Sequence, residues 1–143
     1  MNWEKINQKH FFKQPIEYVY TSTILDLTDY DKLYENTNNF DHPVWQEFDK
    51  KYKTSFQFYE DIREIDLNQT IICLWFFKER TDRGNSEIIE LAGKKLKYLP
   101  NTFLITKSKD IKVLEKQDEY FRRPFLQLGI KEHVWSDILE RFQ

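Results

Sequence analysis

Small residues and cysteine are scarce in this sequence of 143 residues. It contains three glycines, four prolines and one cysteine, and Ala92 is its one alanine. A single cysteine, Cys73, excludes an intramolecular disulfide and therefore a secreted scaffold held together by disulfides. The scarcity of glycine argues against phosphate-binding loops and dinucleotide-binding turns, and neither pattern occurs in the sequence.

Long apolar segments are also missing. No stretch approaches the roughly 20 apolar residues that a membrane-spanning helix needs, and the first residues lack the apolar core of a signal peptide. We therefore predict a cytoplasmic protein that does not engage a membrane. The abundance of Lys, Asn, Ile, Phe and Tyr beside so little alanine indicates an AT-rich coding genome, as in low-GC bacteria and many of their phages.

Aromatic residues, in contrast, are abundant. They make up 17% of the chain, with 12 Phe, 8 Tyr and 4 Trp, while 40% of the residues are hydrophobic and 32% are charged. Aromatic side chains bury large areas, so a few of them supply much of a core. No repeat, low-complexity segment or linker interrupts the chain, and we predict one globular domain over residues 1–143.

Four segments have helical patterns. Residues 3–11 place apolar side chains on one face, a capping box begins a helix with Thr28 as the N-cap, and Pro43 fits the first turn of a helix that Asp41 caps. The clearest helix ends the chain. The expected buried faces are Tyr30, Leu33 and Tyr34; Trp45, Phe48 and Tyr52; and Val134, Trp135, Ile138, Leu139 and Phe142.

Strand patterns dominate the second half of the sequence. The expected strands are 17–25, 70–77, 87–91, 102–106 and 111–114, and residues 55–65 fit either a strand or a helix. Short polar turns between consecutive strands predict antiparallel hairpins. We therefore predict an α+β fold, in which helices from both chain ends pack on a mostly antiparallel sheet of four to five strands.

Charge is unevenly distributed along the chain. Residues 15–70 hold 12 acidic and five basic residues, a formal charge of −7, whereas residues 78–123 hold 12 basic and eight acidic residues, a formal charge of +4. Either the two segments neutralise each other on a solvated surface, or the basic hairpins form a patch for phosphate or an acidic partner.

Two basic segments supply the candidate binding residues. Arg80 and Arg83 lie in the charged turn 78–83, where guanidinium groups grip a carboxylate or phosphate. Tyr120 precedes Arg122 and Arg123, and an aromatic ring beside two arginines suits a nucleic acid or a protein surface. The alternatives are a solvated loop for 78–83 and a buried position for Tyr120.

Histidines and acids give weaker candidates. His42 beside Asp41, or His133 four residues before Asp137, could form an acid–base pair, but helix capping and solvent exposure explain them equally well. Asp82 and Asp110, the latter two residues before Lys112, fit a metal-dependent nuclease. The remaining candidates, His10 and the group Asp26, Asp29 and Asp31, match no metal-binding motif. We predict no catalytic residue, metal or cofactor.

These observations favour a small, non-enzymatic interaction or regulatory protein that binds another macromolecule. Catalytic constellations are absent, while Tyr, Trp and Arg, the residues that anchor interfaces, are plentiful. An accessory or inhibitor protein of a phage or bacterium fits this description, with a protein as partner and a homodimer as a variant. The alternative is a nucleic-acid-binding protein or a metal-dependent nuclease that acts through the basic hairpins of residues 78–123.

Overall fold

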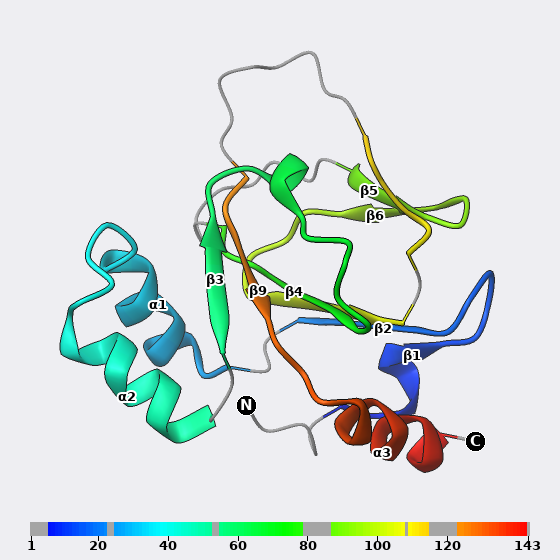
Figure 1. The fold of residues 1–143 in the computed structure, drawn as a ribbon, viewed down its shortest axis with the longest axis horizontal. Coiled ribbons are helices and arrows are strands. Elements are labelled where there is room, and N and C mark those ends of the chain that lie inside the picture. Colours follow the sequence, from blue (N-terminus) through cyan, green and yellow to red (C-terminus); the bar gives the residue numbers. More distant parts are fainter. Residues whose placement is uncertain are drawn as a thin grey trace.

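A computed structural model describes residues 6–22, 25–52, 55–78, 87–107, 109–114 and 123–142. These residues form three α-helices and nine strands in two antiparallel sheets (Figure 1). The α+β class is confirmed, but the number of strands exceeds the predicted four to five. Within the described residues, none of the helices combines the length and the apolar character that crossing a membrane requires.

The larger sheet has six strands, each antiparallel to its neighbours. Its central strand β4 is buried along its whole length, which confirms the predicted strand over 70–77. Such a strand, covered on both faces, produces a continuous apolar run in the sequence. The spatial order of the sheet is β1 (Phe11–Phe12), β2 (Tyr18–Ser22), β7 (Thr102–Thr106), β4 (Ile72–Phe76), β9 (Phe125–Leu128) and β3 (Phe56–Tyr59).

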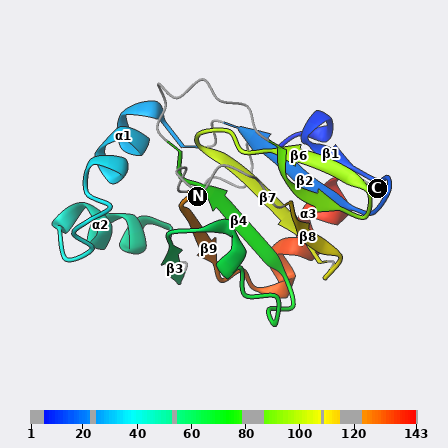
Figure 2. The ribbon, with the colours of Figure 1, turned by 90° about the horizontal axis from the view of Figure 1, so that it is seen from above.

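The smaller sheet has three strands, in the order β6 (Lys94–Lys97), β5 (Glu87–Leu91) and β8 (Ile111–Val113). Its apolar residues share one core with Ile72, Leu74 and Phe76 of β4, so it covers one face of the larger sheet (Figure 2). Tyr20 of β2 donates a hydrogen bond of 2.5 Å to the Lys97 carbonyl and so joins the two sheets. Burial raises the pKa of Tyr20 to about 12, which keeps this donor protonated.

The predicted pairing of consecutive strands is wrong for β4 and β5, and also for β7 and β8, which lie in different sheets. β4 pairs with β7 and β9 in the larger sheet, whereas β5 pairs with β6 and β8 in the smaller one. The predicted hairpin between them is therefore a connection between two sheets. Local sequence indicates that both segments are strands, but it carries no information on which sheet each one joins.

All three helices share a core with the opposite face of the larger sheet, which carries Cys73, Trp75 and Phe77. The helices are α1 (Leu27–Glu35), α2 (Pro43–Tyr52) and α3 (Glu132–Phe142). Tyr30, Trp45 and Trp135 are their largest buried side chains. The molecule thus has three layers, with helices on one face of the larger sheet and the smaller sheet on the other.

The N-terminal helix predicted over residues 3–11 does not form in the described part of that segment. Residues 8–10 make a single 3-10 turn, and Phe11 and Phe12 enter β1 opposite Val19 and Tyr18. The Asn7 side chain caps this turn, and pairing with β2 then holds the chain extended. Of the predicted helices from both chain ends, α3 is confirmed.

Two helix caps differ from the predicted ones. Asp26, not Thr28, caps α1, because its carboxylate accepts the Thr28 N–H at 2.8 Å. At the start of α2, His42 Nδ1 accepts the Val44 N–H at 3.2 Å, which gives His42 the capping role predicted for Asp41. Capping needs an acceptor within reach of a free N–H of the first turn, and a histidine nitrogen meets this need as well as a carboxylate does.

Candidate functional site

The two sheets have four outer strands, and one of them differs from the rest. β1 has two residues and β8 has three, while β6 carries Lys94, Lys95 and Lys97 on four positions, all exposed. Short length and lysines are two ways in which proteins protect sheet edges from unwanted pairing. β3 has four residues, none of them charged, and among the described residues no strand pairs with its outer side.

The hydrogen bonds of β3 determine which backbone groups its outer side presents. The Gly129 N–H donates to the Ser55 carbonyl at 2.9 Å, so these two residues form a hydrogen-bonded pair between the chains of β3 and β9. Such pairs alternate along an antiparallel ladder. Gln57 and Tyr59 therefore point their backbone groups to β9, and Phe56 and Phe58 point theirs outward.

On the helix side of β3, aromatic rings form a continuous surface. The Phe40 ring centroid lies 5.1 Å from that of Phe58 and 4.7 Å from that of Trp45, and the Trp45 and Phe56 centroids are 5.4 Å apart. Trp45 is buried, whereas Phe40 keeps 36% of its surface exposed and Phe56 and Phe58 are half-buried. Phe40, Phe56 and Phe58 thus form an aromatic ledge beside the outer side of β3.

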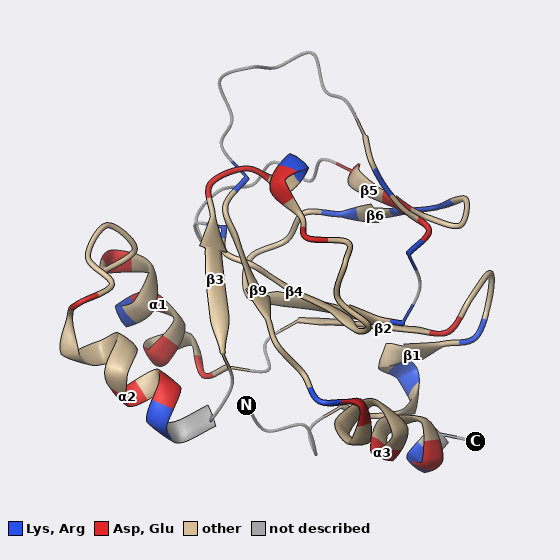
Figure 3. Ribbon diagram, in the orientation of Figure 1, with Lys and Arg blue, Asp and Glu red and all other residues tan. Residues whose placement is uncertain are grey.

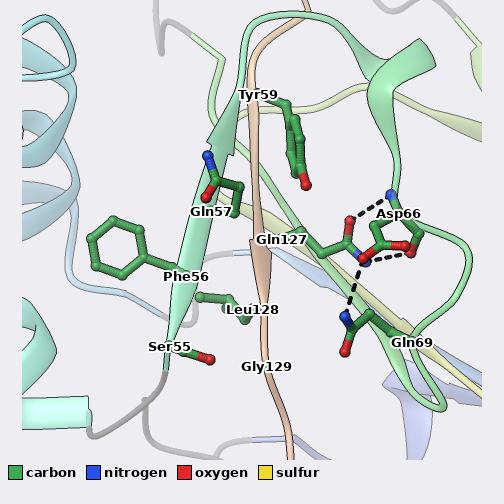
Figure 4. Close-up of a pocket in the computed structure, with 9 residues that line it drawn as sticks. All are labelled: Ser55, Phe56, Gln57, Tyr59, Asp66, Gln69, Gln127, Leu128 and Gly129. Atoms are coloured by element: carbon green, nitrogen blue, oxygen red, sulfur yellow. Dashed lines mark hydrogen bonds between the residues drawn. The ribbon is translucent and has the colours of Figure 1, made fainter.

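On the opposite side of β3 lies a polar pocket of about 260 Å³ (Figure 4). Tyr59 of β3 and Gln127 of β9 face it, whereas Gln57 turns its amide away from Gln127 (Figure 4). The Tyr59 ring stacks on Phe125 with centroids 5.1 Å apart, which holds it against the sheet. The lining is Ser55, Phe56, Gln57, Tyr59, Asp66, Gln69, Gln127, Leu128 and Gly129.

The far wall of this pocket is fixed by Gln127, a buried polar residue. Its side-chain oxygen accepts the Asp66 N–H at 2.9 Å, and its side-chain nitrogen donates to the Asp66 carbonyl at 2.8 Å. The Asp66 carboxylate accepts hydrogen bonds from the Gln69 side chain and the Asn68 N–H, which lower the pKa of Asp66 in that order of importance. The wall is therefore held by hydrogen bonds, and its carboxylate is anionic at neutral pH.

Gly129 lies close to Ser55 at the start of the β3–β9 ladder. A β-carbon at this position would lie 2.4 Å from Ser55 Oγ, far inside contact distance. Glycine leaves room for the Ser55 hydroxyl, which points into the pocket in Figure 4. Glycine at this position thus lets the two chains lie close together beside the first pair of the β3–β9 ladder.

Acidic residues follow β3 directly. Asp61 binds Arg63 through an ion pair of 2.9 Å, and the pKa of Asp61 is lowered mainly by the Arg63 side-chain hydrogen bond and to a smaller extent by the charge of Arg123. Residues 60–66 hold four acids and one arginine. Figure 3 shows these acids in the chain that leaves β3, whereas lysines mark β6.

Of the five predicted binding residues, the structure describes Arg123. It lies two residues before β9, close enough to Asp61 to affect its pKa. The other four, Arg80, Arg83, Tyr120 and Arg122, lie outside the described residues. Lys78, assigned to the exposed turn 78–83, is instead buried, and its Nζ donates to the Tyr98 carbonyl at 3.3 Å.

The smaller sheet is rich in lysines, but glutamates lie opposite several of them on the neighbouring strand. Glu90 of β5 is opposite Lys95 of β6 and Lys112 of β8, and Glu87 is opposite Lys97. Opposite charges on facing strands attract one another and reduce the net charge of the surface. The nucleic-acid alternative stays a prediction that this arrangement does little to support.

The remaining candidates lie apart from each other. His10 accepts the Asn7 N–H and His42 caps α2, so both have structural partners. Asp110 is exposed next to β8, and Asp82 lies outside the described residues. Where the structure describes the chain, no group of three His, Cys, Asp or Glu residues is arranged to hold a metal ion.

Sequence reasoning missed the β3 edge and its pocket. The alternation of Phe56 and Phe58 with Gln57 and Tyr59 indicates a strand, but only the topology makes that strand an outer one. Gln127 was missed because a lone glutamine in a short apolar segment carries no recognisable signal.

Comparisons of the chain with family models, with curated proteins and with solved structures found no match.

Proposed function

We propose that this protein is a non-enzymatic interaction protein that joins another polypeptide by strand addition at β3. The observation that carries the proposal is the contrast among the four outer strands. Three are short or rich in lysine, and β3 is neither. An open sheet edge binds an extended segment through backbone hydrogen bonds, while the flanking surfaces select its side chains.

The two sides of β3 give the added strand different surroundings. Side chains on one side would meet the aromatic ledge of Phe40, Phe56 and Phe58, and those on the other would meet Gln57 and the polar pocket. Since the side chains of a strand alternate between its faces, this favours a segment in which apolar and polar residues alternate. Aromatic side chains exposed beside an open edge are typical of interfaces.

A model peptide tests strand addition directly. The probe is a capped peptide of alternating threonine and valine, added to dilute protein while amide hydrogen exchange is followed by NMR. We expect the Phe56 and Phe58 amides to exchange freely without the peptide and to become protected with it. The Gln57 and Tyr59 amides, already bonded to β9, should stay protected throughout.

Two variants control this experiment. Gln57→Lys places a lysine on β3 as on β6 and should abolish the protection, whereas Gln46→Lys makes the same chemical change on the exposed surface of α2 and should preserve it. Equal protection in both variants would contradict the proposal, and so would free exchange of Phe56 and Phe58 at saturating peptide.

A further inference from the structure

We propose that the natural partner of β3 is the β3 strand of a second copy of this chain, paired antiparallel about a two-fold axis at Gln57. This inference rests on the proposed function, because it names the polypeptide that strand addition recruits. The product is a homodimer with one continuous sheet of twelve strands, twice the six strands of the larger sheet.

Self-pairing leaves the joined sheet with only short outer strands. A two-fold contact uses the same surface on both copies and therefore closes. The outer strands of the joined sheet are then the two copies of β1, which has only two residues. A foreign strand would in turn present its own second edge to the solvent.

The backbone geometry of β3 fits this symmetry. Phe56 and Phe58 both point their backbone groups outward, as the Ser55–Gly129 bond requires. A two-fold axis at Gln57 places Phe56 of one copy opposite Phe58 of the other, so each pair can exchange two hydrogen bonds. The Phe58 carbonyl accepts a hydrogen bond of 3.3 Å from the Gln57 side chain in the single chain, and the incoming Phe56 N–H would replace or share that donor. Gln57 then lies opposite its own copy in a non-hydrogen-bonded pair, where Cα atoms approach to about 4.5 Å.

The side chains fit the same register. A two-fold axis perpendicular to the sheet keeps the helices of both copies on the same face. Phe56 therefore meets Phe58 of the other copy beside the exposed Phe40 rings, and aromatic pairs on facing strands stabilise a sheet. On the pocket side, glutamine meets glutamine, which introduces no charge repulsion.

The charges at the two ends of β3 are complementary under this symmetry. Lys50, in the last turn of α2, precedes the strand, and Glu60 and Asp61 follow it. Antiparallel pairing brings the basic end of one chain toward the acidic end of the other. A parallel arrangement would place like charges together, so charge selects the antiparallel orientation.

Disulfide trapping tests the register. We expect Gln57→Cys to form a crosslinked dimer under mild oxidation, because two residues about 4.5 Å apart satisfy disulfide geometry. Ser55→Cys is the matched control, since its two copies would lie about 14 Å apart along the strands and should not crosslink. Cys73 stays in both variants, because its thiol is fully buried and burial raises its pKa.

A charge exchange tests the same contact without a covalent bond. Gln57→Lys and Gln57→Glu should each raise the dimer dissociation constant about fivefold or more, since like charges would face each other across the axis. An equimolar mixture of the two variants should associate more tightly than either alone. Sedimentation velocity over a dilution series measures the dissociation constants of the two variants and of their mixture.

The outcomes separate this inference from the proposed function. A monomeric protein whose Phe56 and Phe58 amides are protected by the model peptide would overturn the homodimer and leave strand addition standing. A dimer that neither Gln57→Lys nor Gln57→Glu weakens, and in which the Phe56 and Phe58 amides exchange freely, would overturn both the β3 homodimer and strand addition at β3. Crosslinking of Ser55→Cys as readily as Gln57→Cys would overturn the two-fold axis at Gln57.

Discussion

The outer strands β3 and β6 have the same length but opposite surface chemistry. β6 carries lysine at three of its four positions, and β3 carries two phenylalanines, a glutamine and a tyrosine. A second strand on β6 would have to desolvate several ammonium groups, whereas a strand on β3 would cover rings that are already half-buried. Because the two strands are equally long, their residues and not their length determine which of the two edges favours pairing with another strand.

The two edges also rely on glycine for different physical reasons. Gly93 lies in the two-residue turn between β5 and β6 with a φ of +92°, and Ala92 before it has a φ of +49°. No atom lies within 4 Å of a β-carbon added at Gly93. Gly93 is therefore favoured by backbone conformation, and Gly129 beside β3 by the space that the Ser55 hydroxyl occupies.

Removal of the lysines from β6 should have the largest effect. In the variant Lys94→Thr/Lys95→Thr/Lys97→Thr, β6 becomes an uncharged strand of residues that favour extended backbone. We expect association beyond the proposed dimer, seen in sedimentation velocity as an average mass that rises with protein concentration. The contrast between the two edges would then be erased.

The control for this variant removes the same charge elsewhere. Lys9→Thr/Lys13→Thr/Lys32→Thr changes three exposed lysines that lie outside the smaller sheet. It alters the net charge equally and should leave the mass distribution of the natural chain unchanged. If both variants aggregate alike, net charge and not the β6 edge keeps the protein dispersed, and the comparison fails.

Sequence patterns predicted most strands and the helices that enclose the core, because burial leaves a periodic trace. The run 71–77 is apolar throughout because both faces of β4 are covered, and α3 shows helical spacing because one face is buried. β9 was missed because its four residues follow a charged segment and contain Gln127. Strand partnership was out of reach, since β4 joins β7 and β9 across long stretches of chain.

The candidate site was largely unpredictable because it depends on which strands are neighbours. Arginines drew attention to residues 80–83 and 122–123 because charge is visible in a sequence. An open edge is visible only once every strand has its neighbours. The proposed interface residues, Phe56 and Phe58, belong to the one segment whose pattern fits both a strand and a helix.

The turn of the β5–β6 hairpin should respond more weakly than its lysines. Gly93→Ala forces a β-carbon into a left-handed conformation and should lower the free energy of unfolding by about 1–2 kcal/mol. Ala92→Asn should raise it by about 1 kcal/mol or less, because asparagine tolerates this conformation and suits a two-residue hairpin turn. Urea unfolding at one protein concentration measures the free energy of unfolding of the two variants. If both substitutions changed it in the same direction, the conformational explanation would be contradicted.

Gly129→Ala should have the smallest effect, with a sign that depends on Ser55. Its φ lies outside the left-handed region, so alanine fits the backbone, and the loss of chain entropy in the unfolded state favours folding by about 0.4–1 kcal/mol. In the natural chain, displacement of the Ser55 hydroxyl, 2.4 Å from the added carbon, should cancel or reverse that gain. With Ser55→Ala, the nearest Ser55 atom left is the β-carbon, at an ordinary 3.8 Å, and the gain should appear.

A double-mutant cycle of Gly129→Ala and Ser55→Ala therefore isolates the steric term, and we expect a coupling of about 0.5–1.5 kcal/mol. Gly93→Ala combined with Ser55→Ala should show none, because the two sites share no contact. A coupling near zero at Gly129 would mean that the hydroxyl moves aside freely. The register of β3 would then depend on its ladder with β9 alone, and the two glycines would differ only in backbone conformation.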